Sequence, residues 1–263
     1  MKTNRIHFII IVLIICSLSS CEKIINLNLD TSATGIVIVG NVFDHMGPYQ
    51  VVISKTINFT ESNVFPPITG AKVTISDNAG HTNLLTESSP GKYTTSTLKG
   101  IPGVTYTLTV ETEGKTFTAT STMPNPVNID RIYIKRSTVG NEKEITVDFK
   151  DPENIDNYYR VIEYINDTLK TGINVGNDKL YQGKIIDYSL GSTALDNETP
   201  LKTGDRVKVQ LECIDKDVFE YFRTSRGNDG QSTSPANPVS NINNGALGYF
   251  SACSVREATI TVP

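Results

Sequence analysis

The sequence has few of the residues on which metal sites and acid–base catalysis usually depend. Its 263 residues include three histidines, four cysteines and no tryptophan. His45 and His81 stand alone in turn-like segments, where we expect solvated side chains. Metalloprotease, nucleophile-elbow and phosphate-loop motifs are also absent from it. The sequence therefore predicts no metal, no cofactor and no enzyme, although two carboxylates for hydrolysis could still meet in space.

An excess of positive charge is missing as well. The chain has 24 Lys and Arg against 28 Asp and Glu, for a formal net charge of −4. Loss of residues 1–20 would remove Lys2 and Arg5 and change the charge to −6. Nucleic-acid binding needs basic patches. This composition excludes nucleic acid as a partner, and it argues against peripheral binding to anionic lipid.

One long apolar run exists, at the amino terminus. Phe8–Cys16 follows two basic residues and precedes Leu18-Ser19-Ser20-Cys21. Such a run is too short to span a bilayer, which takes about 20 residues, and it is typical of a secretory signal. A leucine and two small residues before cysteine indicate a lipoprotein signal peptide over residues 1–20. We expect diacylglycerol on Cys21, a tether over 21–34 and permanent attachment through two acyl chains.

From residue 35 the sequence is typical of short strands. Apolar and polar residues alternate in runs bounded by Gly, Asn, Asp and Pro, and prolines at 124 and 126 interrupt the pattern. We predict an all-β fold with two β-sandwich domains, 35–124 and 125–263, the second closed by strands at 246–254 and 258–262. One helix is expected near 215–226, with Asp215 as N-cap and with Val218, Phe219 and Phe222 on one face.

Several side chains are candidates for specific roles. Cys213 and Cys253 lie in strand-like runs, where a disulfide is possible but two buried thiols are expected. Partner contacts are expected from two aromatic segments, since a proline-stiffened loop loses little entropy on docking and aromatics supply hot spots. The alternative is that Phe65 plugs the end of the sandwich, while Tyr249 and Phe250 alternate as core and surface of a strand. The contact candidates are Phe65, Pro66, Pro67, Tyr249 and Phe250.

Several segments resemble one family of Bacteroidota outer-membrane lipoproteins, catalogued as domain of unknown function 4249. The matching segments are Cys21-Glu22-Lys23, residues 65–71, Asp151-Pro152 before Tyr158-Tyr159-Arg160, and Asn241-Ile242 before residues 245–250. Within this region, residues 71–110 resemble a transthyretin-like sandwich, so the first domain is expected to be immunoglobulin- or transthyretin-like. Asp167-Thr168-Leu169 resembles the O-glycan acceptor motif of exported Bacteroidota proteins, with Thr168 as the modified residue.

The resemblance implies an outer-membrane lipoprotein, surface-exposed or facing the periplasm, that assists nutrient uptake. Its expected partners are a TonB-dependent receptor, a small nutrient ligand, or both, besides the membrane reached through the lipid. The family offers no catalytic residues to carry over. A surface hydrolase acting on glycan or peptide, and an adhesin or envelope-structural module, are the alternative functions that the sequence leaves open.

Overall fold

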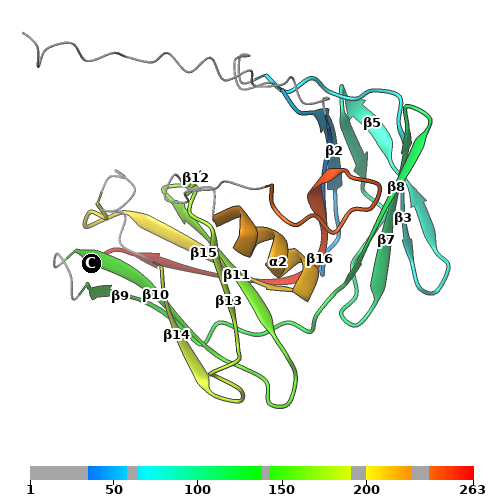
Figure 1. Ribbon diagram of the computed structural model, residues 1–263. Helices are drawn as coiled ribbons and strands as arrows, with labels where there is room; N and C mark the ends of the chain where they lie inside the picture. Colours follow the sequence, from blue (N-terminus) through cyan, green and yellow to red (C-terminus); the bar gives the residue numbers. More distant parts are fainter. Residues whose placement is uncertain (1–34, 58–63, 138–141, 191–199, 227–236) are drawn as a thin grey trace, which may run out of the picture. The chain divides into compact units, whose positions relative to one another are not determined.

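The computed structural model describes residues 35–57, 64–137, 142–190, 200–226 and 237–263. The predicted signal peptide, Cys21 and the predicted tether lie outside these residues. Residues 34–263 form one compact unit. In the described residues no helix is both long and apolar enough to cross a membrane. Strands dominate the described residues (Figure 1), which confirms the all-β prediction.

The first sandwich consists of two facing sheets. One has the order β16-β1-β2-β6-β5 and the other the order β4-β3-β7-β8. Period-two burial along β1 and β7 places Ile38 and Leu108 in the core between the sheets, both at most 1% exposed. The strands in chain order are β1 (Ile36–Phe43), β2 (Tyr49–Lys55), β3 (Lys72–Asp77), β4 (Thr82–Leu84), β5 (Thr86–Ser89), β6 (Lys92–Thr95), β7 (Thr105–Thr112), β8 (Lys115–Thr122) and β16 (Leu247–Thr261).

In the second sandwich, a sheet of order β12-β11-β15-β16 faces a smaller sheet of order β14-β10-β9. Strand β13 pairs with β11. Its core includes Phe149 and Tyr159, whose ring centroids lie 4.8 Å apart, and the buried Leu211. The strands are β9 (Arg131–Arg136), β10 (Lys143–Lys150), β11 (Tyr158–Ile165), β12 (Thr168–Leu169), β13 (Asn174–Asn177), β14 (Ile185–Leu190) and β15 (Arg206–Ile214).

Strand β16 belongs to both sandwiches, so the predicted division at residue 125 requires a correction. From Leu247 to Cys253 the strand pairs in parallel with β1, and from Ser254 to Thr261 it pairs antiparallel with β15. Gly248 permits the first pairing, because a Cβ there would lie 2.0 Å from the carbonyl oxygen of Ile38. The two strands predicted at 246–254 and 258–262 are thus one continuous strand, and its first half completes the core of residues 36–123.

Helix α2 (Lys216–Ser225) confirms the predicted helix. The Asp215 side chain accepts a hydrogen bond from the Val218 amide at 2.9 Å, which makes it the N-cap. Val218, Phe219 and Phe222 are buried, as the predicted apolar face requires. They pack with Tyr249 and Cys253 of β16 in a third cluster of buried residues. The helix therefore covers the strand at the point where it passes from one sandwich to the other.

Candidate functional site

The predicted proline contact lies on a loop of the first sandwich, the proline loop (residues 64–70). Val64 and Phe65 are 72% and 55% exposed, so Phe65 does not plug the sandwich. The loop backbone follows β2: the Lys55 amide donates to the Pro66 carbonyl at 2.8 Å, and the Ile68 amide donates to the Ile53 carbonyl at 3.0 Å. The prolines lack an N–H, yet their loop is fixed because Pro66 still accepts.

Two side chains of the β5–β6 hairpin hydrogen-bond to the backbone of the proline loop and hold it in place. The buried Tyr93 hydroxyl donates to the Ile68 carbonyl and accepts from the Ala71 amide, both at 2.9 Å. The Glu87 carboxylate accepts from the amides of Gly70 and Gly91, at 2.9 and 3.0 Å. These two amides lower the pKa of Glu87 below its ordinary value, since they favour the charged form. The loop is thus ordered before any partner arrives.

A shallow groove of about 440 Å³ runs beside this loop. Its lining includes Pro66, Pro67 and Gly70 of the loop together with Lys55 and Glu113. Lys55 and Glu113 form an ion pair at 2.6 Å with both side chains partly exposed. The groove therefore combines apolar proline side chains with a charged pair, and the exposed Phe65 directly precedes Pro66 in the same loop.

The second predicted contact, Tyr249-Phe250, is wrong as a surface site. Tyr249 is 9% exposed and Phe250 is fully buried. The two side chains alternate along β16, so Phe250 enters the core of the first sandwich while Tyr249 packs against α2. Tyr249 lies with its ring centroid 4.8 Å from those of Tyr221 and Phe222. The alternative interpretation is right that the pair alternates along a strand, but neither residue is the surface residue that it expected, because α2 covers Tyr249.

Cys213 and Cys253 are buried free thiols and form no disulfide. Burial raises the pKa of both thiols, which keeps them protonated. Thr168 lies in the exposed strand β12, so a modifying enzyme could reach it. Its glycosylation stays a prediction. His81 is exposed and contacts Asp77, and the described residues hold no cluster of three potential metal ligands.

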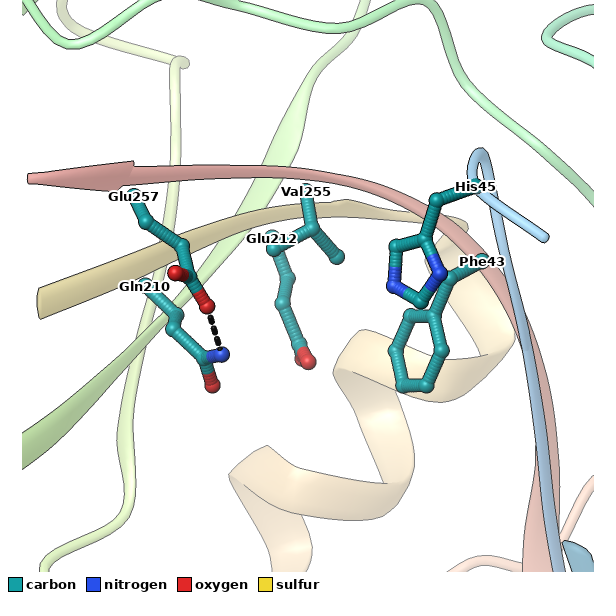
Figure 2. Close-up of a pocket in the computed structure, with 6 residues that line it drawn as sticks. All are labelled: Phe43, His45, Gln210, Glu212, Val255 and Glu257. Carbon is teal, nitrogen blue, oxygen red and sulfur yellow. Dashed lines mark hydrogen bonds between the residues drawn. The ribbon is translucent and has the colours of Figure 1, made fainter. Parts of the chain in front are cut away.

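Sequence reasoning did not find a second concave site, which we call the sheet pocket. Figure 2 shows the Phe43–His45 pair on one side, Gln210 and Glu257 joined by a hydrogen bond on the other, and Glu212 between them. The pocket has a volume of about 150 Å³. Its six lining residues come from three distant parts of the chain: Phe43, His45, Gln210, Glu212, Val255 and Glu257.

Glu212 is the buried charged group of the sheet pocket. Its side chain is 7% exposed, and Arg160 donates to its Oε2 atom at 3.1 Å. The Arg160 guanidinium also lies over the Phe222 ring, 4.0 Å from the centroid. Burial raises the pKa of the Glu212 carboxyl, while Arg160 opposes that shift. The register between β11 and β15 places Arg160 opposite Glu212. Sequence patterns do not specify this register.

Comparison with known proteins identifies the family of this chain. The family described as domain of unknown function, DUF4249, matches residues 22–259. The chain belongs to this family. No curated protein matches it. Among solved structures, a cytokine receptor complex has 9% identity and a TM-score of 0.25, with 86% of this chain and 95% of that chain covered. A two-domain fibronectin type III segment of chicken tenascin has 12% identity and the same TM-score, with 88% and 100% covered.

This DUF4249 chain offers two sites of different character. The proline loop presents exposed apolar side chains on an ordered backbone, which suits docking of another surface. The sheet pocket is smaller and contains two carboxylates, each of which already interacts with a neighbour: Glu212 with Arg160, and Glu257 with Gln210. Family membership adds no role for either site, because the family description states no function.

Proposed function

We propose that this chain is a lipid-anchored accessory protein of a bacterial outer membrane, which binds a TonB-dependent receptor through the proline loop. The observation that carries the proposal is the exposure of Val64 and Phe65 on a loop fixed by Tyr93 and Glu87. The receptor as partner rests on the family resemblance in the sequence, and the anchor rests on the signal and Cys21.

Physical chemistry favours such a loop as a docking element. Ordering a side chain or loop on binding costs about 0.5–1.5 kcal/mol per immobilised group, and a preformed loop avoids much of this cost. An exposed aromatic side chain is a common hot spot when a partner buries it. An acylated Cys21 would confine the protein to the membrane plane, which raises its effective concentration near a membrane partner without any new contact.

The docking test replaces Phe65 with alanine in the tagged full-length protein. We expect F65A to reduce recovery of the receptor at least tenfold, because loss of a buried aromatic anchor commonly costs about 2 kcal/mol or more. Leu84→Ala is the matched control, since Leu84 is 65% exposed on strand β4 of the same sandwich and does not line the groove beside the loop. Equal recovery of the receptor with wild type, F65A and L84A would contradict the proposal.

The anchoring test replaces Cys21 with alanine. We expect this variant to leave the membrane fraction while its circular dichroism spectrum stays that of a folded β-protein. The acylated wild type stays in the membrane fraction because two acyl chains make attachment effectively permanent. A Cys21→Ala protein that remains membrane-bound, or a wild-type amino-terminal peptide with an unmodified thiol in mass spectrometry, would contradict the anchor.

A further inference from the structure

The sheet pocket has a rigid aromatic wall. Asp44 accepts from the Val255 amide at 2.9 Å and pairs with Arg256 at 2.7 Å, so it fastens the end of β1 to β16. The buried Tyr49 hydroxyl hydrogen-bonds the carbonyls of Phe43 and His45. Held in this way, the Phe43 and His45 rings stack with centroids 5.4 Å apart. The wall is therefore held by the protein's own residues.

The hydrogen-bonding capacity left in the pocket consists mainly of acceptors. Arg160 occupies Oε2 of Glu212, and no described residue donates to Oε1. Gln210 donates to Oε1 of Glu257 and accepts from the Tyr164 hydroxyl, which leaves it one N–H. The Nδ1 atom of His45 lies 3.1 Å from the Met46 carbonyl, which only accepts. In the tautomer that donates to this carbonyl, Nε2 has no proton and is a further acceptor.

The charged groups and the volume of the sheet pocket further restrict the kind of ligand that fits. Arg160 pairs with Glu212 at 3.1 Å and Lys208 pairs with Glu257 at 3.8 Å, so a ligand must donate to the carboxylate oxygens that these two cations leave free. The face of the Phe43 ring attracts a cation through its quadrupole. An apolar cavity of about 150 Å³ in another protein holds a benzene molecule. The volume here, about 150 Å³, thus admits the head of a ligand but not a whole oligosaccharide.

We propose that the sheet pocket binds a cationic nitrogen group, the ammonium or guanidinium at the end of a lysine-like or arginine-like side chain. The group donates to Glu212 and Glu257 while its alkyl part lies against Phe43 and Val255. The sheet pocket is separate from the proline loop, because the pocket and the groove beside the loop share no lining residue. The proposal holds whether or not the protein docks on a receptor.

The test is isothermal titration of the detergent-solubilised full chain with four blocked amino acids. N-acetyl-lysine amide and N-acetyl-arginine amide carry the cation, N-acetyl-norleucine amide is the neutral isostere, and N-acetyl-glutamate amide carries the opposite charge. We expect both cationic probes to bind at least tenfold more tightly than the other two, because hydrogen bonds to charged groups are roughly twice as strong as neutral ones. Equal affinity for the lysine and norleucine probes would overturn the proposal.

Variants locate the site. Glu257→Gln is expected to weaken the cationic probes about threefold, since its side chain is 49% exposed and solvent screens it. Glu212→Gln is expected to weaken them about tenfold or more, because it is buried. Glu111→Gln is the matched control, with a side chain 48% exposed on the other sandwich and the same change in net charge.

The outcomes separate this proposal from the docking proposal. If Glu212→Gln does not fold, Glu257→Gln and Phe43→Leu decide, with weaker binding of the cationic probes expected for both. Equal effects of Glu257→Gln and Glu111→Gln would show a non-specific response to charge and would overturn the site. F65A is expected to bind the cationic probes like wild type, so a failure of docking and a failure of the pocket are distinguishable.

Discussion

Removal of a single oxygen atom from Tyr93 should loosen the proline loop without opening a cavity. The Tyr93 side chain is 1% exposed, and its hydroxyl bridges the Ile68 carbonyl and the Ala71 amide at 2.9 Å each. Tyr93→Phe keeps the ring in place and deletes both hydrogen bonds. Since a hydrogen bond contributes about 1 kcal/mol net, we expect the free energy of unfolding to fall by about 2 kcal/mol.

The measurement is urea unfolding at pH 7, followed by circular dichroism at the β-sheet band. A loss of about 2 kcal/mol corresponds to a decrease of roughly 4–8 °C in the melting temperature for a chain of this size. Tyr133→Phe is the control, because the Tyr133 hydroxyl donates to Asp187 at an exposed site. We expect that control to lie within about 0.5 kcal/mol of wild type.

The same variant connects stability with docking. Tyr93→Phe retains Phe65, so any loss of receptor binding would come from the freedom of the loop and not from a missing contact. We expect binding weaker than that of wild type but stronger than that of F65A. A free energy of unfolding of Tyr93→Phe within about 0.5 kcal/mol of wild type would contradict this prediction, because the two hydrogen bonds would then not hold the loop.

Three further variants test other parts of the structure. Phe250→Ala deletes a fully buried ring of the first core and should lower the free energy of unfolding by about 3–5 kcal/mol in urea, whereas a surface residue would tolerate the change. Asp215→Ala removes the N-cap of α2 and should cost about 1–2 kcal/mol, with Asp215→Asn closer to wild type because asparagine also caps. Glu87→Gln tests the lowered pKa of that carboxyl: its stabilisation is present above the ordinary value of 4.5 and is lost as the pH falls through the folded-state pKa. Wild type should therefore exceed Glu87→Gln in thermal stability at pH 7 and approach it at pH 3, and a difference that does not change with pH would contradict this.

Local patterns predicted the elements well, because each pattern reflects a physical period. The apolar alternation of Tyr158–Ile165 predicts a strand over the residues where β11 lies. The change of period after Ile214 predicts α2, including its N-cap and its buried face. Both features depend on neighbours within a few residues along the chain, so they are visible in the sequence.

The burial of single aromatic side chains was harder to predict than the secondary structure in which they lie. Phe65 and Phe250 are the same residue type and equally apolar, yet the first is 55% exposed and the second is fully buried. The difference arises from what packs on each: Phe250 faces the core of the first sandwich, whereas Phe65 follows a loop fixed by Tyr93 and Glu87. Those contacts join segments that are tens of residues apart.

The sequence by itself determined the all-β class, the single described helix, the free thiols as one of two options and the family. The tertiary structure alone decided that β16 pairs with β1 and β15 in turn, and that Phe43, Glu212 and Glu257 share a pocket. Strand pairing uses backbone N–H and C=O groups that every residue carries. The partner of a strand therefore has no signature in its own side chains, and the pocket exists only because that pairing brings three distant segments together.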